Sequence, residues 1–172
     1  MFVPSKLVKT VNTLKSRYTK YLENLCIANG LNIASLKNDG AQVEKLEMYF
    51  GGMPALIGMK YFTSLTILRI FEQDITNVKS LIEVASTLDE LWICEGQLKD
   101  LSGIENCKRL RKLFLYDNQI EDASPLSQLY ALETLCLMNN SIDNLTVSQS
   151  RINHCAYINF LFLHRFFPHL SF

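Results

Sequence analysis

The protein chain has 172 residues, of which 48% are hydrophobic and 20% are charged. This length suits one domain, and the composition excludes extensive disorder and collagen-like repetition. Seventeen basic residues balance seventeen acidic ones, so the chain lacks the net positive charge that is typical of proteins binding nucleic acids or anionic membranes.

The N-terminal segment has the pattern of an amphipathic helix. Apolar residues recur mostly at helical spacing over residues 5–29, and Gly30 is a suitable helix stop. We expect this helix to cap the open edge of the repeat array that follows. A helix lying on a membrane surface is the alternative. The segment has no uninterrupted apolar core of the length that a secretory signal needs.

A leucine repeat begins at residue 43 and is present in five consecutive units. The last three units superpose on the frame L-x-x-L-x-[IL]-x-x-[NG]-x-[IL], and the first two follow it at the same spacing of 22 residues, which rises once to 23, between Leu68 and Leu91. The units are VEKLEMYFGGM (43–53), LTILRIFEQDI (65–75), LDELWICEGQL (88–98), LRKLFLYDNQI (110–120) and LETLCLMNNSI (132–142). Such self-similarity predicts a solenoid.

The frame also predicts how each turn of the solenoid folds. The alternation in its middle indicates a short strand, and the asparagine position turns the chain toward a tight return segment. One turn cannot bury its leucines alone, so neighbouring turns stack and their parallel strands line a concave face. We expect equivalent buried positions for the central leucines. These are Leu46, Leu68, Leu91, Leu113 and Leu135.

The asparagine of the frame is replaced by another residue in the first three units. The position holds Gly51, Gln73 and Gly96 there, and asparagine only at Asn118 and Asn140. An asparagine amide can bond backbone groups of neighbouring turns, whereas glycine supplies only a left-handed turn. We therefore expect the first three turns to be less regular than the last two.

The outward positions of the predicted strands form columns of large side chains across neighbouring turns. Five aromatics that each leave ~100 Å² exposed would make a patch of ~500 Å², at the upper end for a monomer. This favours a surface for docking a protein partner, with stacking for stability alone as the alternative. The predicted partner-binding residues are Tyr49, Phe71, Trp92, Phe114, Tyr116 and Met138, with an acidic rim of Glu72, Glu95 and Asp117.

The last segment, residues 149–172, abandons the repeat frame and is rich in phenylalanine. It is either an improvised cap over the last strand or the end of a truncated isoform or gene product. The domain prediction is a helical cap at 1–42, leucine repeats at 43–148 and this tail at 149–172.

No motif in the sequence indicates catalysis or a cofactor. Phosphate loops, dinucleotide fingerprints and metalloprotease motifs are missing. The three histidines lie in the tail near Cys155 without metal-ligand spacing. We expect no catalytic, cofactor or metal residues. Cys94 and Cys136 would lie ~9–10 Å apart on strands ~4.8 Å apart, beyond the ~7 Å limit for a disulfide, so they should stay free.

The repeats resemble those of the SDS22-like family of leucine-rich repeat proteins. The 22-residue frame carries this resemblance. A closer likeness to one leucine-rich repeat protein rests on YLENLCIANGL (21–31), VEKLEMYFGGMP (43–54), LDELWICEG (88–96) and LRKLFLYDNQIED (110–122). The resemblance implies an α/β leucine-rich repeat solenoid, a right-handed arc of about five turns, and a non-enzymatic scaffold in the cytoplasm, with a cilium or axoneme as the narrower location.

Two alternatives remain within that resemblance. One is a module like the regulatory subunit of protein phosphatase 1, and the other is a spliceosomal-type leucine-rich protein in a nucleic-acid complex. Neutral charge and the acidic column argue against direct RNA contact. We expect a monomer that binds a protein partner and neither nucleic acid nor membrane.

Overall fold

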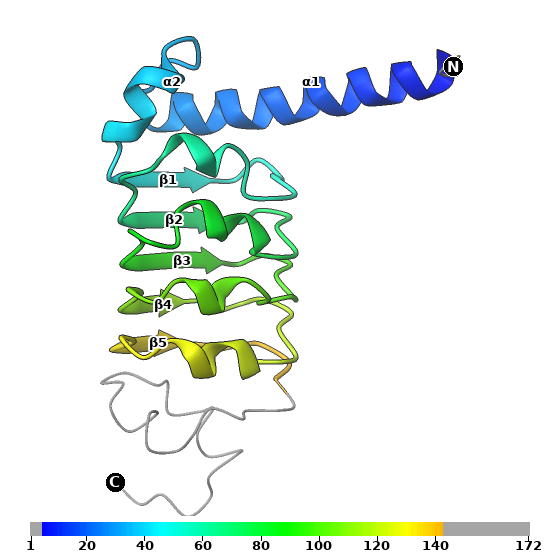
Figure 1. The fold of residues 1–172 in the computed structure, drawn as a ribbon. Helices are drawn as coiled ribbons and strands as arrows, with labels where there is room; N and C mark the ends of the chain where they lie inside the picture. The colour runs from blue at the N-terminus through cyan, green and yellow to red at the C-terminus, as the bar shows by residue number, and fades with distance from the viewer. Residues whose placement is uncertain (1–4, 143–172) are drawn as a thin grey trace, which may run out of the picture.

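The computed structural model describes residues 5–142 of the chain, with side chains from residue 17 onward. The tail predicted at 149–172 lies outside the described residues. A long helix and a short one precede a solenoid of five turns, and each turn holds one strand and a 3₁₀ return segment (Figure 1). The elements are α1 (Ser5–Ala28), α2 (Leu36–Asp39), β1 (Lys45–Tyr49), β2 (Ile67–Phe71), β3 (Glu90–Cys94), β4 (Lys112–Phe114) and β5 (Thr134–Cys136).

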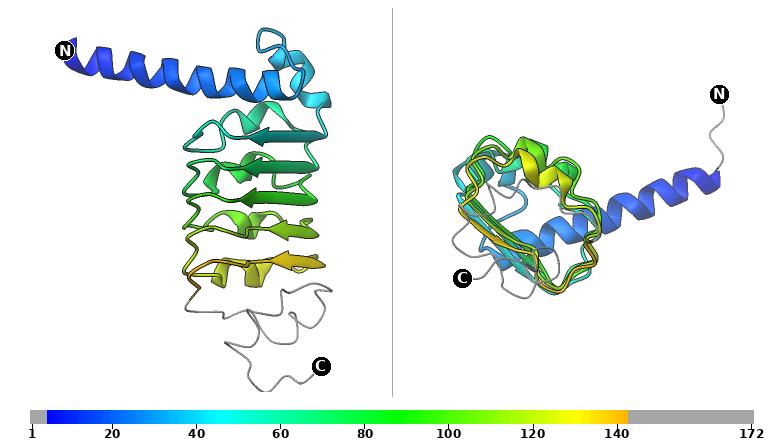
Figure 2. Two further views of the ribbon diagram at one scale, coloured as in Figure 1. Left: turned by 180° about the vertical axis from the view of Figure 1, so that it is seen from behind. Right: turned by 90° about the horizontal axis from the view of Figure 1, so that it is seen from below.

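The five strands form one parallel sheet in chain order, β1-β2-β3-β4-β5. The central leucines pair with one another across it and none is more than 5% exposed. The predicted register is therefore confirmed. Viewed along the stack, the sheet forms one side of a ring and the return segments form the opposite side (Figure 2). The leucine core fills the space between them.

Asparagine side chains tie neighbouring turns together. The Asn118 carboxamide is buried and its Oδ1 accepts a hydrogen bond from the N–H of Leu98, at 3.0 Å. Its Nδ2 donates to the carbonyls of Ile93, Leu115 and Tyr116, at 2.7 to 3.2 Å. These contacts pair backbone groups in and beside the core, and the Tyr116 carbonyl accepts from the Glu95 N–H as well.

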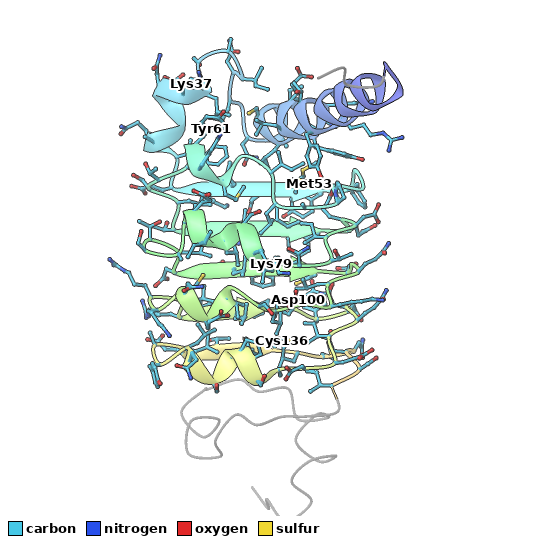
Figure 3. The ribbon with its side chains drawn as sticks, turned by 45° about the vertical axis from the view of Figure 1, so that its right-hand side comes forward. Lys37, Met53, Tyr61, Lys79, Asp100 and Cys136 are labelled. Atoms are coloured by element: carbon cyan, nitrogen blue, oxygen red, sulfur yellow. The ribbon has the colours of Figure 1, made fainter. Side chains whose placement is uncertain are left out.

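The same arrangement recurs in other turns. Asn140 accepts from the N–H of Ile120 at 3.1 Å and donates back to carbonyls of its own and the preceding turn. Gln73 takes this role in the second turn, because its Oε1 accepts from the N–H of Met53 at 2.7 Å. Met53 itself points into the core (Figure 3) and is 0% exposed.

The early turns are less regular in one respect, as expected: among the described turns, glycines with positive φ lie in the first and the third, at Gly51, Gly52, Gly58 and Gly103. Another backbone feature is the same in all five turns. Every turn places one non-glycine residue in the left-handed region, with φ between 52° and 60°, directly before the asparagine position. Gly96 has no positive φ, so it does not supply the left-handed geometry. A Cβ there would lie 2.8 Å from the Gln73 carbonyl oxygen, so glycine allows the two turns to approach. The left-handed residues are Phe50, Glu72, Glu95, Asp117 and Asn139.

The C-terminal end of α1 caps the first strand, as predicted. Leu25 and Cys26 are buried in the core. The Asn29 side chain accepts from the Glu47 N–H and donates to the Glu47 carbonyl, both at 2.8 Å. It thereby replaces a neighbouring strand at the edge of β1. The helix ends at Ala28, and Gly30 beyond it stops the chain from continuing as a helix, since its φ of 67° allows the Leu31 N–H to bond the Cys26 carbonyl at 2.8 Å.

The rest of α1 departs from the expectation that residues 5–29 cover the solenoid. Its N-terminal half extends past the outline of the turns (Figure 2), and Tyr18 is 46% exposed. The reason is length: a 24-residue helix is about 36 Å long, about twice the length of a five-residue strand. Among the described residues, no helix is both long and apolar enough to cross a bilayer.

Ion pairs add contacts between turns on the side of the returns. Lys79 and Asp100 lie on neighbouring turns (Figure 3), with Lys79 Nζ 3.2 Å from Asp100 Oδ2. Both side chains are well exposed, so this pair contributes little to the free energy of unfolding. Stability rests mainly on the leucine core and the buried amides.

Truncating a core leucine tests the register. Leu113→Ala should lower the free energy of unfolding by about 2–5 kcal/mol, because it leaves a cavity in the centre of the array. Urea denaturation measures this, with the exposed Arg109→Ala as the control. A loss below about 0.5 kcal/mol, the level of an ordinary surface substitution, would contradict the buried position.

Removing the buried amide tests the asparagine contacts. Asn118→Ala should lower the free energy of unfolding by about 3 kcal/mol or more, because several buried backbone groups lose their partner at about 1–3 kcal/mol each. The exposed neighbour Gln119→Ala provides the matched control in the same denaturation experiment. Equal stability of the two variants would show that the amide contributes nothing.

Candidate functional site

The outward side of the sheet, which we call the sheet face, carries three columns of side chains. Strand alternation brings every second residue of each strand to this face. The first column holds Glu47, Arg69, Trp92, Phe114 and Cys136, and the second holds Tyr49, Phe71, Cys94, Tyr116 and Met138. The third, directly after the strands, holds Phe50, Glu72, Glu95, Asp117 and Asn139.

Four of the predicted aromatics lie in contact across four strands. Tyr49 and Phe71 are stacked, with ring centroids 4.9 Å apart and planes 2° apart. Trp92 and Phe114 are stacked at 3.7 Å and 15°. A tilted contact of 6.0 Å between Phe71 and Trp92 joins the two pairs. We call these four residues the aromatic ladder.

The other predicted residues of the second column lie beyond the ladder. The Tyr116 hydroxyl is 3.4 Å from Glu95 Oε1, and burial raises the pKa of Tyr116 to about 12. Met138 is partly buried on the fifth turn. Between Phe71 and Tyr116 lies Cys94, whose thiol donates to the Phe114 carbonyl. Burial raises the pKa of Cys94 to about 12, so this thiol stays protonated at neutral pH.

A charged cluster lies beside the ladder. Arg69 donates through Nε and Nη2 to Glu90 Oε1, at 2.9 and 2.6 Å, and through Nη1 to Glu47 at 3.1 Å. Its guanidinium lies 5.7 Å from the Trp92 ring centroid. The indole N–H of Trp92 also donates to Glu90 Oε1, at 2.8 Å. These contacts hold the Trp92 ring in a fixed orientation.

Glu90 stays ionised at the centre of this cluster. Burial of its carboxylate would raise the pKa, but the hydrogen bonds from Arg69 and Trp92, with the nearby charges of Arg69 and Lys112, outweigh burial and lower it. The predicted site did not include Glu90. Strand alternation could have identified it, since Glu90 lies two residues before Trp92 and therefore on the same side of β3.

The three acidic residues of the predicted rim lie in successive turns. Glu72 and Glu95 are exposed and Asp117 is partly exposed. Among the ion pairs of residues 17–142, none includes these three carboxylates. Asp117 accepts a hydrogen bond from the Asn139 amide at 2.6 Å. We call Glu72, Glu95 and Asp117 the acidic rim.

The described side chains form no group of His, Cys, Asp and Glu that could hold a metal ion. The three histidines and Cys155 lie outside the described residues. The four described cysteines, Cys26, Cys94, Cys107 and Cys136, are free thiols, as predicted for Cys94 and Cys136. The described surface is therefore distinguished by its aromatic and charged side chains, which suit contact with another molecule.

The lowered pKa of Glu90 predicts a pH-dependent contribution to stability. It is present above the ordinary carboxyl pKa of 4.5 and is lost as the pH falls through the lower folded-state value. Glu90→Gln should therefore cost about 1–2 kcal/mol near pH 7 and much less in acid. Urea unfolding of both proteins across this pH range checks it, with the exposed Glu83→Gln as the control. A loss that is constant with pH would contradict the ion pair.

Comparison with known proteins agrees with this architecture. A family model described as leucine-rich repeats (2 copies) matches residues 86–128 and 108–150. An internalin from Listeria monocytogenes has 22% sequence identity and a TM-score of 0.61, over 71% of this chain and 36% of the internalin chain. The leucine-rich repeat ectodomain of the receptor kinase SOBIR1 from Arabidopsis thaliana has 17% identity and a TM-score of 0.49, over 67% and 65% of the two chains.

The chain thus spans about a third of the internalin it matches, with 36% of that chain covered. The matched repeats, the stacked strands, the buried leucines and the likeness to the internalin together show that the chain has the leucine-rich repeat fold.

Proposed function

We propose that the chain is a non-catalytic scaffold that binds a protein partner on the sheet face. The observation that carries this proposal is the aromatic ladder, which runs across four adjacent strands. Domains built from leucine-rich repeats generally serve protein interaction, and stacked repeats create extended binding surfaces. Tyr49 and Phe50, at one end of the ladder, are 55% and 61% exposed.

The composition of the face supports binding rather than stacking alone. Trp, Tyr and Arg are the residue types on which binding energy concentrates in protein interfaces, and Trp92, Tyr49 and Arg69 lie in one continuous patch. Hydrogen bonds fix Trp92 and Arg69 before any partner arrives. A partner therefore meets side chains that lose little conformational entropy on binding.

The narrower proposal is a cytoplasmic scaffold associated with a cilium or axoneme. It rests on the resemblance of residues 20–147 to the N-terminal region of leucine-rich repeat-containing protein 9, which includes the segment around Asn29 and Gly30. Capture of the same partners from ciliated cells but not from non-ciliated cells would support this location.

The docking role is tested by a double substitution on the ladder. Trp92→Ala with Phe114→Ala should abolish capture of partners identified by mass spectrometry, because truncating central aromatics typically costs about 2 kcal/mol or more of binding free energy each. The matched control is Ile82→Ala with Tyr130→Ala, which removes two exposed apolar side chains on the side of the return segments. Circular dichroism verifies that both proteins are folded at the assay temperature.

A third variant separates docking from stability. Leu91→Ala with Ile93→Ala removes the buried neighbours of Trp92 and should unfold the chain. If the ladder variant melts as early as this core variant, the aromatics serve stability and the docking proposal fails. If the ladder variant stays folded and captures every partner, binding lies on another surface.

A further inference from the structure

We propose that the partner segment bound on the sheet face is basic, with arginine side chains on the acidic rim and apolar side chains on the aromatic ladder. This inference rests on the proposed function and names the chemistry of the partner. It follows from where negative charge remains uncompensated on the face.

The acidic rim concentrates charge of one sign. Glu72, Glu95 and Asp117 occupy the same position in successive turns, and neighbouring strands of a parallel sheet lie about 4.8 Å apart. Like charges at such a separation repel one another. No described lysine or arginine forms an ion pair with any of them.

The carboxylates within the strands, Glu47 in β1 and Glu90 in β3, are compensated. Glu47 lies 2.9 Å from Lys45 and 3.1 Å from Arg69. Glu90 lies 2.6 Å from Arg69 and 3.6 Å from Lys112. The unbalanced negative charge of the sheet face is therefore located at the rim, where a cationic side chain of a partner would relieve the repulsion.

The aromatic residues next to the rim favour arginine. Phe71 and Glu72 are consecutive residues, as are Tyr116 and Asp117, so an aromatic ring and a carboxylate adjoin in both turns. A guanidinium can stack on a ring while it donates to a carboxylate, which a lysine ammonium does less well. Arg69 already makes both contacts inside the face, with Trp92 and Glu90.

The spacing of the rim sets the spacing of the arginines. From Glu72 to Asp117 the rim spans two strand separations, about 9.6 Å. A peptide in the polyproline II conformation advances about 3.1 Å per residue with three residues per turn, so it covers this length in about three residues and brings positions i and i+3 to the same side. Arginines three positions apart would face the two ends of the rim.

Fluorescence anisotropy with a labelled Arg-Leu-Gly-Arg-Leu-Gly-Arg-Leu-Gly peptide tests the inference. We expect this peptide to bind more tightly than its lysine analogue, and the citrulline and glutamate analogues not to bind. Raising the salt concentration from about 50 to about 300 mM should weaken binding several-fold, because exposed charges are screened. Failure of the arginine peptide to bind, or equal binding of the citrulline analogue, would overturn the proposal.

A charge-matched pair of variants locates the binding. The rim variant is Glu72→Gln, Glu95→Gln and Asp117→Asn, and it should bind the arginine peptide about tenfold more weakly. The control, Glu23→Gln, Glu44→Gln and Glu83→Gln, removes three exposed carboxylates elsewhere and should bind within about twofold of the wild type. Equal weakening in both would mean that only net charge matters, and the proposal would fail.

The rim variant also separates this inference from the proposed function. If partner capture depends on Trp92 and Phe114 but survives in the rim variant, the docking function stands and the basic partner segment is wrong. If the wild-type chain forms a dimer that the rim variant cannot form, the face binds a second copy, which also overturns the assignment to a partner protein. Loss of capture in the rim variant, with capture retained by its control, supports the basic segment.

Discussion

Turns of this solenoid bury backbone groups that their own strands cannot pair, and side-chain amides reach such groups from three of the five turns, at Gln73, Asn118 and Asn140. Asn118 shows the constraint most fully, because it bonds a carbonyl 25 residues earlier and an N–H 20 residues earlier in the chain. The reach of one asparagine is fixed, so the length of the turn is nearly fixed as well. Stability consequently resides in contacts between neighbouring turns, as expected for a linear repeat array.

The same spacing determines the chemistry of the sheet face. Residues of one column lie one strand separation apart, which is close to the distance at which aromatic rings stack. Trp92 and Phe114 share a column and stack at 3.7 Å, whereas Phe71 and Trp92 lie in different columns and tilt by 44° at 6.0 Å. A column of alternating charge neutralises itself, while a column of like charge, such as the acidic rim, does not.

Leucine spacing predicted the strands and their register because it is a property of the whole array. Strand alternation likewise predicted which residues face outward, including the ladder aromatics. The contacts of Arg69 with Glu90 could not be predicted, since they depend on side-chain conformations in two turns at once. The residue that is left-handed in every turn was not predicted, because glycine was expected to supply this geometry; Phe50, Glu72 and Glu95 adopt it directly before the asparagine position, and Gly51 has a positive φ as well.

Closure of the first strand by Asn29 gives the array a polarity. The Asn29 amide occupies the edge of β1 through both backbone groups of Glu47, so no further strand can join there without displacing it. Duplicating a turn inside the array would leave this closure intact and would lengthen the sheet by about 4.8 Å. Growth by internal duplication is thus compatible with the fold, whereas growth ahead of the cap requires a new cap. The number of turns can therefore vary without a change in the N-terminal segment. A larger number of turns would give a longer sheet face, which accommodates a longer partner segment.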